Sequence, residues 1–491
     1  MNYSKKISDI PLVSPSTFRS HVTSETQEDK RLIALWASPD SHDRETGIRL
    51  FAALGQDEEG QIEVISTHPP KEYLSITEDC PQAHLFEREL WENYDITPNE
   101  HPWLKPVRFP QKAVHRPSKV GEINFYRVEG EEIHEVGVGP VHAGIIEPGH
   151  FRFQCHGELV EHLEISLGYQ HRGIERNMKE GPHKRSLYYA ENIAGDTCIG
   201  HTWAYCKNLE ALAGVTVDRR SLLLRAIMLE LERLANHVGD LGALAGDIGF
   251  LPTSNYCGRI RGDYLNLSLF VCGSRFGKSM MVPGGVRFDL PLEKNHEFLT
   301  RLNAAYRDTK GAIDLLWQSA SVMDRFEGTG SLSQQQAKDI GLVGPAARAC
   351  GIKHDVRKNY PHQGLYETLN LASSESGDVL ARAQVRFAEC AASVDFIKWA
   401  VSELEKHPYA QAQSLPHLAA DTISLSLTEG WRGEICHIAQ TNEHGKFHHY
   451  KIIDPSFHNW FGLSLALRGQ EISDFPLCNK SFNLSYCGHD L

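Results

Sequence analysis

The segment covering residues 139–210 places the strongest constraint on the fold. It concentrates Gly, Pro, His and Arg between apolar positions in three words, GPVHAGIIEPGHFRFQCHGE, LGYQHRGIERN and ENIAGDTCIGHTWAYCKNLE. Residues 141–155 predict two short strands joined by a turn at 147–149, because proline fixes φ there and glycine takes φ values that other residues avoid. The predicted hairpin holds His142 and His150 on either side of its tip.

The length and charge of the chain exclude several classes of protein. At 491 residues it is too long for one core, which predicts two or three domains. The net charge is −13 and the acidic excess is spread along the chain, so there is no basic footprint for nucleic acid. The N-terminus has no apolar h-region, and no window approaches the roughly 20 apolar residues that cross a bilayer. We therefore expect a soluble, cytoplasmic protein.

The cysteines argue against a metal site within the chain. Their number, 11, is odd, and without a signal peptide this favours reduced thiols over a disulfide framework. No two cysteines lie three residues apart. Structural zinc and iron–sulfur sites generally draw a close pair of thiolates from one turn. Both kinds of site are therefore disfavoured here.

The N-terminal part has the order of a small α+β domain. Residues 31–37, 48–54 and 61–67 read as strands or short helices, and residues 71–91 carry helical periodicity with Phe86 and Leu90 on one side. Residues 109–120 contain Pro and Lys without periodicity, which suits a linker with the domain boundary near residue 115.

The clearest helix is predicted over residues 218–241, where Asp218 can cap the N-terminus. Its apolar residues recur at helical spacing and would form one buried stripe: Leu223, Ile227, Leu231, Leu234 and Val238. Further helices are expected at residues 296–323, 333–340 and 377–406. In the C-terminal quarter, strands are predicted at residues 423–430, 431–440 and 448–453.

Four motifs resemble, in order and spacing, the large subunit of energy-converting nickel–iron hydrogenases and its relative, the quinone-site (49 kDa-type) subunit of respiratory complex I. These motifs are GPVH, EPGHFRF, HRGIER and AYCKNLE. PGGV, GLVGPAARACGIKHDVRK and EGWRGE also match this family, although Trp431 stands where proline is usual. FERELWENYDITPNEHPWLKPVRFP resembles the end of the 30 kDa-type subunit, which is fused to the large one in several relatives. A solvated helix face is the alternative interpretation of its Glu87 to Glu89.

The resemblance implies an α+β fold with two domains. Residues 1–115 would form a 30 kDa-type α+β domain with its linker. Residues 116–491 would form a mainly α-helical, hydrogenase-large-subunit-like domain, with small β-sheets near its start and in its C-terminal quarter.

The metal-ligand positions of the hydrogenases are changed in this chain. Their ERxCGxC word places two thiolates where this sequence has Ala194 and Thr197, and their DPCxxC ending would fall on Cys478 and Ser481 if one inserted residue is allowed. A nickel–iron centre needs four converging thiolates, so we predict no metal in this chain. In complex I the emptied space holds a quinone, but that subunit's quinone-site tyrosine falls on Gly195 here.

The candidate site residues follow from the resemblance, and each has a structural alternative. His142 and His150 would donate to an acceptor or supply protons, or else bond backbone carbonyls in a turn. Asp196 and His201 flank the old metal position and would carry protons, or else are satisfied core groups. Two arginines, Arg152 and Arg172, would lie near a partner's iron–sulfur cluster; the alternatives are a surface strand residue for Arg152 and pairing with Glu175 for Arg172.

Three functions remain open. The first is the catalytic-type subunit of a membrane-associated, complex I-like oxidoreductase that couples electron transfer to ion translocation. It would lie on the inner face of the cell membrane, attached through a small iron–sulfur subunit (complex I 20 kDa-like) and antiporter-like membrane subunits. No cofactor would be held by this chain; a quinone is the candidate acceptor, and the iron–sulfur cluster belongs to the small subunit. The second function is a non-redox scaffold, and the third a hydrogenase with aberrant ligands.

Overall fold

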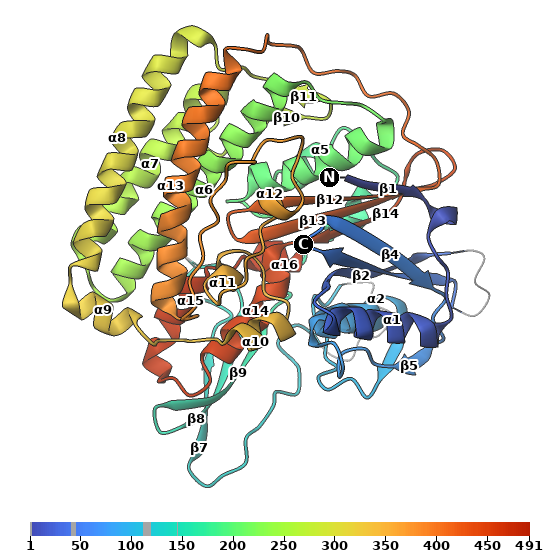
Figure 1. Ribbon diagram of the computed structural model, residues 1–491. Coiled ribbons are helices and arrows are strands. Elements are labelled where there is room, and N and C mark those ends of the chain that lie inside the picture. The colour runs from blue at the N-terminus through green and yellow to red at the C-terminus, as the bar shows by residue number, and fades with distance from the viewer. Residues whose placement is uncertain (1, 41–45, 111–118, 145) are drawn as a thin grey trace.

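A computed structural model describes residues 2–40, 46–110, 119–144 and 146–491. It confirms the α+β class. Figure 1 shows a bundle of long helices on one side, a four-stranded sheet in the middle, the N-terminal unit on the other side and a small three-stranded sheet below. The site discussed later lies where the small sheet, the start of α5 (Cys198–Ala213) and the C-terminal helices meet.

The N-terminal unit is built around an antiparallel sheet in the order β2–β3–β4. Its strands are β2 (Arg31–Pro39), β3 (Ile48–Gln56) and β4 (Gln61–Thr67), so the three segments predicted as strands or short helices are all strands. Helix α1 (Pro15–Gln27) packs on this sheet. Burial on both faces explains the near-continuous apolar runs of β2 and β3.

The helix predicted over residues 71–91 is wrong in its first half. Residues 72–74 form β5 (Glu72–Leu74), which pairs in parallel with β6 (Thr97–Asn99), and helix α2 covers only His84–Tyr94. Pro81 starts a short 3₁₀ turn ahead of α2, because proline suits the first turn of a helix and disrupts its interior. Phe86 and Leu90 are buried on one side of α2, as the periodicity predicts.

The acidic residues of α2 do not form a solvated face. Glu87 is fully buried and accepts hydrogen bonds from the backbone N–H groups of Ile76 (2.9 Å) and Thr77 (3.0 Å). Glu89 is also buried and accepts from Lys451 Nζ at 2.6 Å, which ties α2 to the C-terminal sheet. Both carboxylates therefore hold the fold together.

The predicted helices are present, but the one expected over residues 296–323 is broken at residues 318–319, and the one expected to end at residue 241 continues to residue 247. Helix α6 (Arg219–Asp247) begins at the Asp218 cap, whose side chain accepts from Ser221 N–H at 2.9 Å. It packs against α7 (Leu251–Cys272) and α13 (Val379–Leu404), and α7 packs against α8 (Leu292–Trp317). The shorter elements around the bundle are α9 (Ala320–Phe326), α10 (Gln334–Asp339), α11 (Gly344–Arg348), α12 (Val356–Asn359), β10 (Met281–Val282) and β11 (Gly285–Val286).

The central sheet joins the first residues of the chain to the C-terminal quarter. Its order is β1–β12–β13–β14, with β1 (Asn2–Lys6), β12 (Thr422–Gly430), β13 (Gly433–Thr441) and β14 (Phe447–Ile453), all antiparallel. The three predicted C-terminal strands are confirmed. One apolar cluster runs from the N-terminal unit into this sheet, so the two units share a core. The boundary predicted near residue 115 lies outside the described residues.

The small sheet corrects the predicted hairpin. Its order is β7–β8–β9, with β7 (Ile133–Val138), β8 (His150–His156) and β9 (Leu159–Ser166). The partner of β8 therefore precedes residue 139, and the stretch predicted as the first strand belongs to the connection between β7 and β8. Gly139 begins this connection at φ 84°, a conformation that ends a strand.

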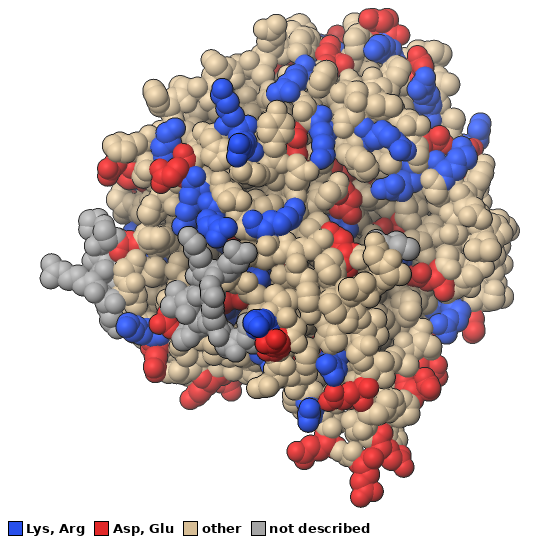
Figure 2. All heavy atoms as spheres, turned by 180° about the vertical axis from the view of Figure 1, so that it is seen from behind, with Lys and Arg blue, Asp and Glu red and all other residues tan. Residues whose placement is uncertain are grey.

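Short helices complete the chain around this sheet. They are α3 (Ile174–Met178), α4 (Ser186–Ala190), α14 (Pro455–Ala466), α15 (Phe475–Phe482) and α16 (Tyr486–Asp490). Among the described residues, no helix is both long and apolar enough to cross a membrane. Figure 2 shows acidic side chains gathered at the lower tip of the molecule, where Figure 1 places β7 and β8, and charges of both signs elsewhere on that face.

Candidate functional site

The two histidines of the first motif close the connection between β7 and β8 from both ends. His142 Nε2 lies 2.9 Å from the carbonyl oxygen of Gly149, and His150 Nδ1 lies 3.1 Å from that of Gly139. A carbonyl only accepts, so each of these ring nitrogens carries the proton and donates. The structure thus places both histidines in the backbone-bonding role that was the alternative interpretation.

The two rings differ in what their other nitrogen meets. His150 Nε2 is buried and has no hydrogen-bond partner among the described residues. Burial lowers the pKa of His150 below its ordinary value, which favours the neutral ring. A neutral ring that donates through Nδ1 has an unprotonated Nε2, so this atom accepts a hydrogen bond or a proton; it donates only once the ring is charged.

The segment 194–197, where the resemblance places two thiolates, carries an ion pair instead. Ala194 is fully buried and offers no ligand atom. Arg432, which follows β12, donates to both oxygens of Asp196 at 2.7 and 2.8 Å. Burial alone would raise the pKa of Asp196, but this guanidinium outweighs burial and holds the pKa below the ordinary aspartate value. The Thr197 hydroxyl donates to Asp196 at 3.0 Å and accepts from Trp431 Nε1 at 3.2 Å, so it is already engaged.

The C-terminal residues beside this position are not those expected. Ser481 accepts from Arg382 Nε at 2.8 Å, inside the fold against α13. Cys478 is fully buried, and burial raises the pKa of its thiol to about 12. The residues that reach the old metal position are Asn483, whose carbonyl accepts from Arg432 at 2.5 Å, and Cys487, whose thiol receives a hydrogen bond from the backbone N–H of Gly195.

The donor set therefore does not fit a nickel–iron centre. Of the eleven cysteines, all within the described residues, only Cys487 is not buried, and burial raises the pKa of its thiol to about 11. One protonated thiol beside an alanine and an engaged threonine cannot supply four convergent thiolates.

The two candidate arginines have different surroundings. Arg172 donates to the backbone carbonyls of Ile193 (2.7 Å) and Cys487 (2.9 Å), so it fastens the C-terminal helix to the segment before α5. The alternative pairing of Arg172 with Glu175 is wrong, since Glu175 accepts from Ile452 N–H at 2.8 Å. Arg152 pairs with Glu135 across β7 and β8 at 2.9 Å, and its side chain is 29% exposed.

His201 lies behind the site in a buried polar chain. Its Nε2 is 2.9 Å from Asp454 Oδ2, and its Nδ1 is 3.1 Å from His437 Nε2. His437 Nδ1 in turn lies 3.0 Å from the Tyr450 hydroxyl. All four side chains are buried, and Asp454, which neighbours the C-terminal helix at Gly488, links His201 to the site.

Three segments that are distant in sequence thus converge. The β7–β8 connection touches the C-terminal helix where Glu147 Oε2 accepts from Tyr486 N–H at 3.3 Å. A side chain on Gly149 would come within 2.6 Å of the Tyr486 ring, so only glycine fits there. Gly195 is exposed, and a side chain on it would meet no other atom within 4 Å, so the surface beside Asp196 is open. The arrangement offers hydrogen-bonding and proton-accepting groups near this open surface.

Sequence reasoning missed Glu232, which lies in the word ELERLANH of α6. Its carboxylate accepts from the backbone N–H of Ile199 (2.7 Å) and of Gly200 (3.2 Å), at the start of α5. Burial raises the pKa of Glu232 to about 8 despite these bonds. Nothing in the sequence distinguishes Glu232 from the other polar residues of this helix.

The raised pKa of Glu232 predicts a pH-dependent stability. The folded protein keeps this proton up to about pH 8, whereas an unfolded glutamate loses it near the ordinary value of 4.5. The contribution of this proton to the free energy of unfolding is therefore complete below pH 4.5, and it is lost as the pH rises towards 8. We expect Glu232→Gln, which mimics the protonated acid, to gain roughly 2–4 kcal/mol relative to the parent between pH 5 and pH 8.

Urea denaturation at both pH values measures this gain. Glu158→Gln, at an exposed position of the β8–β9 turn, is the matched control and should follow the parent at both pH values. A pH-independent difference between Glu232→Gln and the parent would contradict the assignment.

Comparison with known proteins agrees with this architecture. The description "Respiratory-chain NADH dehydrogenase, 49 Kd subunit" matches residues 247–424, and "Respiratory-chain NADH dehydrogenase, 30 Kd subunit" matches residues 30–120. The carbon monoxide-induced hydrogenase of Rhodospirillum rubrum is 31% identical over 71% of this chain and 96% of its own. NADH-quinone oxidoreductase subunit 4 of Thermus thermophilus is 31% identical over 70% of this chain and 90% of its own.

Two further matches extend the comparison: one covers more of the chain, and the other is a solved structure that shows the fold alone. Formate hydrogenlyase subunit 5 of Escherichia coli is 28% identical over 87% of this chain and 78% of its own. A chain of the membrane-bound sulfane sulfur reductase shares the fold, with a TM-score of 0.65 and 22% identity over 74% of this chain and all of that one. The chain therefore belongs to the family of the 49 kDa subunit of respiratory NADH dehydrogenase and the large subunits of membrane-bound hydrogenases, with a segment of the 30 kDa type at its N-terminus.

Proposed function

We propose that this chain is the catalytic-type large subunit of a membrane-associated oxidoreductase that couples electron transfer to ion translocation without a nickel–iron centre. The replacement of the metal ligands within a retained scaffold carries the proposal. Ala194 and Thr197 stand at two thiolate positions, and the Asp196–Arg432 ion pair occupies the space beside them. The scaffold supports a redox partner's approach, while the donor set supports an organic acceptor such as a quinone.

The geometry suggests a division of labour between the two histidines. His142 locks the β7–β8 connection through Gly149. His150 holds the other end and presents a buried, unpartnered Nε2. In the proposed function Nε2 takes up a proton and, as part of the charged ring, passes it to the reduced acceptor. Arg152 and Arg172 would lie towards a partner's iron–sulfur cluster, where a cation favours the reduced state of the cluster.

The proposed partners follow from the family. A small iron–sulfur subunit would cover the β7–β8 connection and the open surface beside Gly195, and antiporter-like subunits would anchor the assembly to the inner face of the cell membrane. A scaffold without redox activity is the second candidate, and it is favoured by the engagement of Thr197 and both histidines in bonds within the chain.

Elemental analysis of the natively purified complex tests the loss of the metal. We expect nickel well below stoichiometry and no hydrogen-dependent dye reduction, because a soft metal needs thiolates that the site lacks. The iron–sulfur subunit and the antiporter-like subunits should co-purify. Stoichiometric nickel with hydrogen-dependent dye reduction would overturn the proposal, and Cys487→Ser would then be the first ligand variant to examine. Recovery of the chain without an iron–sulfur subunit would favour the scaffold.

A further inference from the structure

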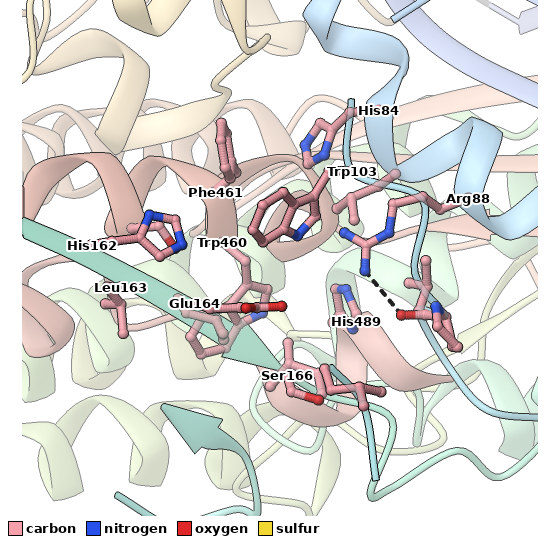
Figure 3. Close-up of a pocket in the computed structure, with 17 residues that line it drawn as sticks. His84, Arg88, Trp103, His162, Leu163, Glu164, Ser166, Trp460, Phe461 and His489 are labelled. Atoms are coloured by element: carbon pink, nitrogen blue, oxygen red, sulfur yellow. Dashed lines mark hydrogen bonds between the residues drawn. The ribbon is translucent and has the colours of Figure 1, made fainter. Parts of the chain in front are cut away.

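A small cavity lies at the junction of the two units, apart from the candidate site. It is lined by α2, the segment after it, β9, α14 and the C-terminal helix, and Figure 3 shows the side chains around it. Its volume is about 60 Å³. A water-sized group needs roughly 10–15 Å³ of such space, so the cavity has room for about four or five of them. None of its described lining residues belongs to the β7–β8 connection or to the segment 191–197.

Arg88 supplies an unpaired positive charge to this cavity. Its Nε donates to the carbonyl of Lys105 at 2.7 Å and its Nη2 to that of Pro106 at 2.9 Å. Within the described part of the chain Nη1 has no hydrogen-bond partner, and no carboxylate forms an ion pair with the guanidinium. Burial lowers the pKa of Arg88 to about 10, which still leaves it charged at neutral pH. A cation held only by carbonyls favours an anion at its free nitrogen.

The acidic residue of the cavity binds other groups. Glu164 accepts from Lys105 Nζ at 2.7 Å through one oxygen and from Tyr126 N–H at 2.7 Å through the other. Glu164 and Glu92 attract Arg88 electrostatically, but within the described part of the chain neither forms an ion pair with its guanidinium. The free nitrogen of Arg88 therefore still lacks an acceptor.

The remaining walls combine an unsatisfied nitrogen with apolar rings. His162 Nε2 is buried without a partner among the described residues, and the His84 ring packs against Phe461, with 4.9 Å between the ring centroids. Burial lowers the pKa of both rings, so each is neutral and can present one N–H group. Trp103, Trp460 and Phe461 supply the apolar surface (Figure 3).

We propose that this cavity binds a small monocarboxylate, with its carboxylate on Arg88 and its alkyl part against Trp103 and Trp460. One negative charge suffices for the free nitrogen of Arg88, whereas a dianion such as phosphate would bring a second negative charge close to the carboxylate of Glu164. A carboxylate also matches the planar guanidinium, and the apolar rings match a short alkyl group. Because α2 belongs to the N-terminal unit and β9 and α14 to the large unit, the bound acid would bridge them and stabilise their junction.

Titration of the full chain with propionate at constant ionic strength tests the proposal, with thermal unfolding and ¹³C-propionate NMR as measurements. We expect a saturable rise in unfolding temperature and saturable line broadening. Propionamide, which has the same shape without the charge, should produce neither. Arg88→Gln should weaken propionate binding at least ~10-fold, since it removes a charge-assisted contact. Arg307→Gln, at a side chain that is 79% exposed, is the matched control and should bind as the parent does.

A second variant keeps the test decisive if Arg88→Gln does not fold. Ser464 lines the cavity and is buried, with no side-chain hydrogen bond among the described residues. Ser464→Leu should fill the cavity and abolish propionate binding while Arg88 stays in place. Equal effects of propionate and propionamide, an absence of saturation, or undiminished binding by Ser464→Leu would each overturn the proposal and leave water as the occupant.

Discussion

We expect Glu389→Ala to destabilise the protein by about 3–5 kcal/mol, the usual cost of removing one partner from a buried ion pair. Glu389 lies on α13, where one oxygen accepts from Arg348 Nε (2.9 Å) and Nη2 (2.7 Å). The other oxygen lies 2.9 Å from His237 Nε2 on α6. Burial alone would raise the pKa of Glu389, but Arg348 and His237 outweigh it and hold the pKa well below its ordinary value.

The effect is large because the carboxylate connects several elements. Arg348 ends α11 and also donates to Glu429 at the end of β12, at 2.9 Å. Arg233, on α6, donates to the backbone carbonyl of Glu429 at 2.7 Å. Without Glu389, Arg348 keeps its charge but loses the acceptor of two of its nitrogens, at a position that is fully buried.

The midpoint of urea denaturation, followed by tryptophan fluorescence, measures the loss. Asp395→Ala is the control on the same helix, because that side chain is 81% exposed and should change stability by less than about 0.5 kcal/mol. Glu389→Gln should fall between the two, since it keeps an acceptor and loses the charge. A midpoint for Glu389→Ala equal to that of Asp395→Ala would contradict the role given to this network.

Much of the fold could be predicted because local signals agreed with the tertiary structure. The α6 stripe and its Asp218 cap combine periodicity with a capping residue, and both are present. The prediction failed where tertiary contacts decide. Residues 72–74 pair with a strand that lies after α2, and no local pattern announces that partner. In the β7–β8 hairpin, Gly137 and Gly139 made the true first strand look like loop, whereas the apolar residues after Pro140 resembled a strand.

The candidate site was predictable in its components and not in its contacts. The matched words identified the segments that meet, and the missing cysteines were evident in the sequence. That Arg432 binds Asp196, and that Asn483 and Cys487 rather than Cys478 reach the old metal position, depends on the helix break after α15. Asn483 takes φ 44° at that break, which turns the chain by an amount that sequence spacing does not give.

His150→Asn should lower electron transfer to an organic acceptor roughly 10²-fold, as the loss of an acid–base group typically does. The asparagine amide can replace Nδ1 as the donor to Gly139, so the β7–β8 connection keeps its bond while the group at Nε2 disappears. Viologen-driven reduction of a short-chain quinone by the purified complex measures the effect. His142→Gln keeps a donor for Gly149 and should retain most of the activity, because the proposal gives that ring a structural role alone.

The pH dependence of the electron-transfer rate distinguishes proton transfer by His150 from a purely structural role. If the charged ring must deliver the proton to the reduced acceptor, the rate should fall as the pH rises through the pKa of His150, which burial places below its ordinary value of 6.5. This fall should be absent in His150→Asn and unchanged in His134→Ala, a control at an exposed position of β7. A His150→Asn complex that keeps the parent rate and the parent pH dependence would remove His150 from the mechanism. Loss of assembly in His150→Asn would assign it to the fold, since a ring needed only for its Nε2 chemistry leaves the subunit contacts intact.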